Sequence, residues 1–138
     1  MDKNAPVGNR RHLVRDRPDP LAGCPLAAAF RAIGGKWKLT ILYWLAHGEL
    51  HVAGLARRVA PISHKVLAQQ LRELEADGIV ARTPTGAVPA PVVYALTAYG
   101  STLLPLIEGV RAWGEGHLRR LPAPPAGAMA CEVAVQVR

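Results

Sequence analysis

The most constraining feature of the sequence is a pair of helix-forming segments, residues 52–59 and 64–77, that only four residues separate. Pro61 lies in this connection, and it ends the first segment because proline has no N–H to donate inside a helix. Ser63 is suited to cap the second segment, and Gly78 is suited to end it. Two helices joined by so short a connection predict a helix-turn-helix.

Two short β-prone segments follow these helices, at Ile79–Thr83 and Val92–Leu96. The segment PTGAVPAP between them is rich in proline and predicts a hairpin with a long, stiff tip. A hairpin placed directly after a helix-turn-helix is a wing. The predicted fold is therefore a mainly α winged helix-turn-helix with a small β-hairpin.

Three further helices are predicted around this motif. The first covers residues 25–33, and the second, residues 37–46, is apolar enough to be nearly buried. The third follows Thr97, a capping residue, and Pro105 is expected to kink it or divide it in two. The first helix has an apolar face made by Leu26, Phe30 and Ile33.

The length of 138 residues suits one domain. We expect residues 1–22 to be a flexible basic arm, because this polar, arginine-rich stretch cannot bury enough surface to order itself. Residues 23–120 form the winged helix-turn-helix domain, and residues 121–138 form a Pro/Ala-rich tail. Alternating valines at the end of this tail predict a short terminal strand.

The charge balance favours a polyanionic partner, because the formal net charge is +7 and the sequence pI is about 10.1. Charge alone does not choose between a nucleic acid and an anionic membrane surface. No run of about 18 apolar residues and no secretory signal occurs, so we expect no membrane helix. Two cysteines are too few for a disulfide framework, and a reducing, cytoplasmic location is expected.

The second helix of the pair has two distinct faces on a helical wheel. Leu67, Leu71 and Leu74 form a core stripe, and Lys65, Gln69, Arg72 and Ala76 lie opposite it. The wheel places Glu73, Glu75 and Asp77 away from this outer face. A face with cations and an amide but no carboxylate suits a helix in the major groove, where phosphates would repel an acid.

The chemistry of the outer face matches base edges in duplex DNA. Lysine and arginine donate to guanine, glutamine pairs with adenine, and a small apolar side chain contacts the thymine methyl group. The candidate groove residues are His64, Lys65, Ala68, Gln69 and Arg72. An ordinary solvated amphipathic helix would show the same wheel, but the order of the neighbouring elements favours DNA binding.

Several motifs in this order make the chain similar to a known family. They are Cys24-Pro25, Gly34-Gly35-Lys36-Trp37-Lys38, Ile62–Leu67, Leu71–Val80, Val93–Thr97, Gly100 and Trp113. With these motifs, which span about two thirds of the chain, the sequence resembles the HxlR family of winged-helix regulators, relatives of the MarR group.

The resemblance implies a homodimer formed through the first and last helices, with the helix at 63–77 in the major groove. It implies a pseudo-palindromic operator as partner, Ser63 as a further groove residue, and Arg82 as the cation at the base of the wing. Two positions depart from the family pattern. His51-Val52 replaces an Arg-Phe pair before the third helix, and the wing carries no arginine after its prolines. We expect the basic arm to supply the charge that the wing lacks.

Cys24 is the candidate regulatory residue, because a thiol at a helix N-terminus meets the positive end of the helix dipole, which favours the thiolate. Some members of the family that the chain resembles sense oxidants or electrophiles through a cysteine at this position. The alternative is a small, partly buried residue without a signalling role. Cys131, in the tail, is expected to be a free surface thiol.

Other chemistry finds little support in the sequence. No nucleotide-binding, hydrolase or zinc-protease motif is present, so we predict neither an enzyme nor a cofactor. His47 and His51 have the spacing of a metal pair, but Gly48 breaks the helix that this spacing needs. The tryptophans are expected to pack in the core and at the dimer contact rather than to line a small-molecule pocket. The alternative function is a protein-interaction module whose basic face meets an acidic partner.

Overall fold

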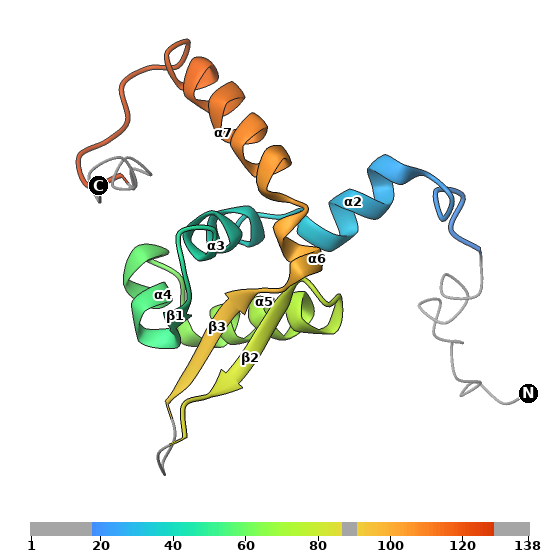
Figure 1. The fold of residues 1–138 in the computed structure, drawn as a ribbon. Coiled ribbons are helices and arrows are strands. Elements are labelled where there is room, and N and C mark those ends of the chain that lie inside the picture. Colours follow the sequence, from blue (N-terminus) through green and yellow to red (C-terminus); the bar gives the residue numbers. More distant parts are fainter. Residues whose placement is uncertain (1–17, 87–90, 129–138) are drawn as a thin grey trace, which may run out of the picture.

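The structure is a computed structural model that describes residues 18–86 and 91–128. The described part contains six helices and three strands, and most of them lie where the sequence predicts (Figure 1). In chain order the elements are α2 (Pro25–Ile33), α3 (Lys38–Leu45), β1 (Leu50–His51), α4 (Val52–Arg58), α5 (His64–Ala76), β2 (Val80–Pro84), β3 (Val92–Leu96), α6 (Ala98–Ser101) and α7 (Leu104–Leu118).

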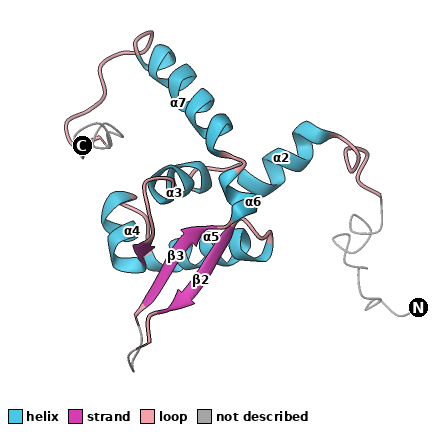
Figure 2. Cartoon of the chain, in the orientation of Figure 1, coloured by secondary structure: helices cyan, strands magenta, loops and turns pink. Residues whose placement is uncertain are grey.

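The sheet has the strand order β1-β3-β2, and both pairings are antiparallel (Figure 2). Val80 pairs with Leu96 and Pro84 with Val92, which makes β2 and β3 the predicted hairpin. Strand β1 was not predicted, because a strand of two residues is too short to show alternation. Its residue Leu50 pairs with Tyr94, so β1 joins the start of α4 to the hairpin.

The core lies between α3, the helix-turn-helix and the sheet. Ile41 and Leu42 of α3 are fully buried, as the apolar composition of this helix predicts. They pack in one cluster with Leu67, Leu71 and Leu74, the predicted inner stripe of α5. The mainly α winged helix-turn-helix fold is therefore confirmed.

Local capping signals set both ends of α5. The Ser63 hydroxyl accepts a hydrogen bond from the Val66 backbone N–H at 3.2 Å, as predicted for an N-cap. Gly78 follows the helix with a φ of +73°, a left-handed conformation that glycine adopts without steric cost.

Substituting Ser63 by alanine should lower the free energy of unfolding by about 1 kcal/mol, because one N–H of the first turn loses its acceptor. Urea denaturation followed by circular dichroism measures this change. Ser63→Thr should retain most of the stability, since threonine keeps the capping oxygen. Equal stability of the alanine variant and the native protein would contradict the role of this cap.

The predicted last helix is divided in two, as Pro105 indicated. Thr97 caps α6 through its hydroxyl, which accepts from the Gly100 N–H at 2.9 Å. A new helix, α7, begins at Leu104, and Pro105 occupies its first turn, where a missing N–H costs nothing. The short helix α6 and the start of α7 lead the chain away from the sheet (Figure 1).

Helices α2 and α7 project from the body of the molecule and leave most of their apolar side chains uncovered (Figure 1). Ile33 is the one buried residue of α2, and Ile107 is the one buried residue of α7. Phe30 is 76% exposed and Trp113 is 71% exposed. Of the apolar face predicted for α2, Ile33 is buried in the core, whereas Leu26 and Phe30 are exposed in the described part of the chain.

The predicted arm and tail lie largely outside the described residues. The structure does not describe residues 1–17 and 129–138, in which most of the predicted arm, the predicted terminal strand and Cys131 fall. Just before α2 the chain makes a turn in which Asp19 accepts from the Leu21 N–H at 2.8 Å and pairs with Arg31. The boundaries of arm, domain and tail remain predictions.

Candidate nucleic-acid interface

The outer face of α5 is exposed, as the wheel predicts. Ala68 is half-buried at the margin of the leucine stripe. The exposed candidates are Ser63, His64, Lys65, Gln69 and Arg72. The Ser63 oxygen accepts the capping bond, and its hydroxyl proton can still be donated to a phosphate. Six of the seven predicted groove and wing residues therefore lie on, or at the start of, one helix.

A side-chain network ties two of these residues to the interior. The Gln69 Nε2 group donates to Glu73 Oε1 at 3.0 Å, and the Arg72 guanidinium donates to Gln69 Oε1 at 2.8 Å. The Lys38 Nζ atom, from α3, lies 2.8 Å from Glu73 Oε2. The prediction that the outer face of α5 carries no carboxylate is therefore wrong at one edge of this face, where Glu73 contacts Gln69.

The charge of Glu73 is compensated. The hydrogen bond from Lys38 is the largest cause that holds the pKa of the Glu73 carboxyl below its ordinary value, and the bond from Gln69 acts in the same direction. Glu73 is therefore ionised at neutral pH and paired with a cation, which reduces its repulsion of a nearby phosphate. The pair of Lys38 and Glu73 was not predicted, because helical periodicity carries no information on contacts between α3 and α5. A lysine within an otherwise apolar segment was the one available signal.

The wing brings a further cation toward α5. Arg82 is exposed on β2 and lies opposite Tyr94 of β3, on the same sheet face as the buried Val80. Strand β2 and helix α5 contact each other, so the base of the wing lies beside α5. Residues 87–90 at the wing tip are outside the described residues.

Cys24 occupies the predicted position immediately before α2. It is the N-cap residue, is partly buried, and its side chain makes no capping hydrogen bond. Pro25 follows in the first turn of the helix. The thiol therefore lies at the start of the helix whose Phe30 and Leu26 are exposed.

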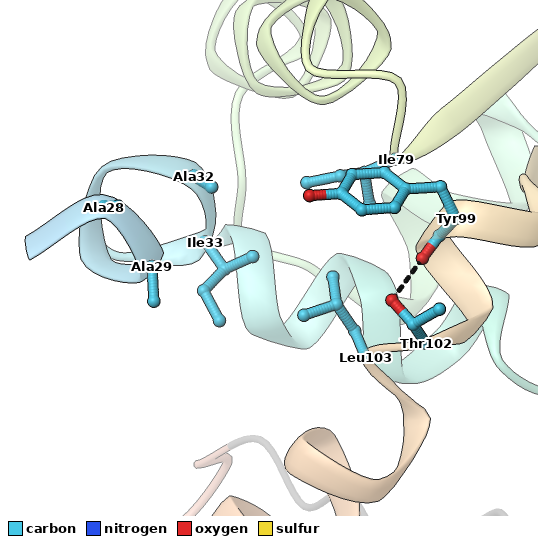
Figure 3. A pocket seen from close by; sticks show the side chains of 8 residues that line it. All are labelled: Ala28, Ala29, Ala32, Ile33, Ile79, Tyr99, Thr102 and Leu103. Carbon is cyan, nitrogen blue, oxygen red and sulfur yellow. Dashed lines mark hydrogen bonds between the residues drawn. The ribbon is translucent and has the colours of Figure 1, made fainter. Parts of the chain in front are cut away.

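A cavity of about 300 Å³ opens between α2 and α6 (Figure 3). Its walls are mostly apolar, and the Thr102 hydroxyl is satisfied by the Tyr99 carbonyl at 2.6 Å. The lining residues are Ala28, Ala29, Ala32, Ile33, Ile79, Tyr99, Thr102 and Leu103. No tryptophan lines it, so it differs from the tryptophan-lined pocket that the sequence analysis considered.

The two histidines with metal-pair spacing are engaged separately. His47 Nδ1 lies 2.8 Å from the Tyr43 carbonyl oxygen, and His51 Nδ1 lies 3.3 Å from the Val92 carbonyl oxygen. Within residues 18–86 and 91–128, no three His, Cys, Asp or Glu side chains gather as metal ligands. None of the described helices combines the length and the apolar composition required to cross a bilayer.

Comparison with known proteins gives a consistent picture. The profile of the HxlR-like helix-turn-helix family matches residues 32–122. The uncharacterized HTH-type transcriptional regulator YtcD of Bacillus subtilis is 44% identical over 94 residues, which cover 68% of this chain and 75% of that protein.

Two solved structures of redox-related regulators share this fold. The redox regulator HypR in its oxidized form is 41% identical with a TM-score of 0.65, over 67% of this chain and 96% of that one. The reduced form of the transcriptional regulator YodB from B. subtilis is 32% identical with a TM-score of 0.60, over 67% of this chain and 91% of that one.

Proposed function

Because the chain belongs to the HxlR-like helix-turn-helix family of DNA-binding transcriptional regulators, we propose that it reads a pseudo-palindromic operator as a homodimer. In this proposal α5 enters the major groove, and Ser63, His64 and Lys65 contact the DNA near its start. Gln69 and Arg72 read bases, Ala68 lies against a base edge, and Arg82 binds phosphate beside the wing. The protein acts in the cytoplasm and performs no catalysis.

The observation that carries this proposal is the exposed row of Lys65, Gln69 and Arg72 on a helix that is fixed by buried leucines on its other side. A rigid helix with cations and an amide on its outer face meets the steric and electrostatic needs of the major groove. The formal net charge of +7 adds a favourable interaction with phosphates.

Fluorescence anisotropy on duplex DNA from upstream of the protein's own gene tests the function, with a scrambled duplex as control. We expect binding to the upstream duplex that exceeds binding to the scrambled one and weakens steeply with salt. Absence of binding to any duplex would contradict DNA recognition and direct attention to an acidic protein partner.

Substituting Lys65 or Arg72 by alanine should weaken operator binding by about 1–3 kcal/mol if the side chain contacts a base. Glu75→Gln serves as the control, because Glu75 is exposed on the same helix but away from the outer face. Anisotropy titrations on selected and scrambled duplexes measure both effects. An equal loss on both duplexes would reassign the residue to phosphate contact, and no loss would remove it from the interface.

The exposed apolar faces of α2 and α7 support dimerisation. Large uncovered hydrophobic patches on a soluble domain mark contact surfaces, and here they lie on the two helices that leave the body of the molecule. The exposed apolar residues of these helices are Leu26, Phe30, Leu104, Leu106, Val110, Trp113 and Leu118. Two copies joined through these helices would present two α5 helices to successive major grooves, with half-sites about 10–10.5 bp apart or a multiple of that.

We also propose that Cys24 senses oxidants, because it lies at the start of α2, beside the proposed dimer surface. The similarity to HypR and YodB supports this role. Oxidation of the Cys24 thiol by hydrogen peroxide gives a sulfenic acid and water, which changes the size and polarity of the side chain at this contact. A small-molecule effector bound between α2 and α6 is the alternative signal.

The Cys24→Ser variant should bind DNA equally with and without hydrogen peroxide. For the native protein we expect the oxidant to change affinity by about 5–150-fold, the range of typical allosteric coupling. Cys131→Ser is the matched control and should respond like the native protein. A peroxide response that persists in Cys24→Ser would exclude Cys24 as the sensor.

A further inference from the structure

We propose that Lys38 and Glu73 are positioning residues that set the side-chain orientation of Gln69 and Arg72 for base reading. The proposal rests on the function proposed above, since it assigns to α3 a part in the recognition made by α5. Neither Lys38 nor Glu73 needs to touch DNA in this role.

The anchor of the network is Lys38. It is 6% exposed, and in the described part of the chain it is the one charged side chain that is buried. A buried ammonium group requires a compensating charge, because loss of hydration is costly in the interior. Glu73 supplies this charge at 2.8 Å, and its own side chain is 42% exposed. The carboxylate therefore bridges the buried cation and the surface of α5.

Glu73 dictates which way the Gln69 amide points. A carboxylate only accepts hydrogen bonds, so the group that lies 3.0 Å from Glu73 Oε1 must be the Gln69 NH₂. The Gln69 carbonyl oxygen then faces the Arg72 guanidinium, which donates to it at 2.8 Å. The reverse orientation would place oxygen against oxygen at Glu73 and nitrogen against nitrogen at Arg72.

This orientation leaves the amide able to read a base. The Gln69 nitrogen has a second hydrogen, and its oxygen has a second lone pair. These two groups match adenine N7 and N6, the pair that glutamine recognises in the major groove. Because the amide is held before DNA arrives, recognition requires less ordering of the side chain. Arg72 is restrained by the same contact.

The ion pair also limits the effect of an acid beside DNA. The Lys38 hydrogen bond and charge hold the pKa of Glu73 low, so the carboxylate keeps its acceptor role at neutral pH. Lys38 offsets the negative charge that phosphates would otherwise meet. Removing Lys38 alone would leave an uncompensated carboxylate at the interface.

The first test compares base preferences, measured by selection and sequencing from a duplex pool with a randomised core. The central variant is Lys38→Met with Glu73→Gln, which removes both charges together and leaves no unpaired buried ion. We expect this double variant to discriminate between bases about tenfold less well at the positions that Gln69→Ala affects. Its base preferences at the other positions should stay native. Glu75→Gln, on the same helix outside the network, should show the native profile.

If Lys38 and Glu73 only stabilised the fold, the double variant would lose base preference equally at all positions of the DNA site. A uniform loss, or an unchanged preference at the positions sensitive to Gln69→Ala, would therefore overturn the proposal. Urea denaturation of the double variant confirms that the comparison is made on folded protein.

A second measurement needs no DNA. The ¹H–¹⁵N signals of the Gln69 side-chain amide, assigned with Gln69→Ala, report the bond to Glu73 in the free protein. We expect these signals to shift in the double variant and to stay in place in Glu75→Gln. Signals that do not move would overturn the positioning role by themselves, whereas absence of DNA binding by the native protein would contradict the proposed function.

Discussion

Replacing Phe30 by aspartate should make the protein monomeric and weaken its binding to a duplex with two half-sites by about 100-fold or more. Phe30 is 76% exposed in the single chain, and the proposed dimer covers it. A charge placed in an apolar contact loses its hydration without gaining a partner. A monomer also loses the second binding event, and linked sites typically gain 10²–10⁴-fold in avidity.

Sedimentation analysis and anisotropy on duplexes with one or two half-sites measure this effect. Phe30→Leu is the matched control, because it keeps the apolar face and should remain dimeric. The aspartate variant should keep the native affinity for a single half-site, since Phe30 lies on α2 and the groove residues lie on α5. A variant that stays dimeric would move the dimer contact away from α2.

Replacing Gly100 by alanine should lower the free energy of unfolding by about 3 kcal/mol, at the upper end of the usual cost of overpacking. Gly100 is buried in α6, and a Cβ atom there would lie 2.0 Å from the Ile79 carbonyl oxygen. That oxygen accepts from the Thr97 N–H at 3.1 Å and cannot move away without breaking the bond. Helix α6 would therefore separate from the entry to the wing.

Gly54→Ala is the control for the effect of alanine itself. Gly54 lies in α4, outside the proposed dimer surface, and a Cβ there would meet its nearest atoms at 3.5 and 3.6 Å, which is ordinary contact, so alanine should stabilise the helix by about 0.5–1 kcal/mol. Urea denaturation of both variants measures the contrast. Equal stability of Gly100→Ala and the native protein would mean that α6 and Ile79 are not in close contact.

The sequence by itself determined the order of the elements and many of their ends. Ser63, Thr97 and Gly78 act through hydrogen bonds or backbone conformations within a few residues, so their effects are local and readable. Pro105 divided the last helix for the same reason. The inner leucine stripe of α5 followed from the helical period alone.

Only the tertiary structure decided the features that depend on contacts between distant segments. Strand β1 forms because β3 offers it a partner, and its two residues carry no pattern of their own. The contact between Glu73 and Gln69 is local by contrast, because residues four apart are neighbours on a helix surface, and the wheel analysis overlooked it. The burial of Lys38 and its pairing with Glu73 required the packing of α3 against α5, two helices far apart along the chain. Local interactions thus determined the helices and strands, whereas packing between α3 and α5 determined how Glu73 is compensated beside the outer face of α5.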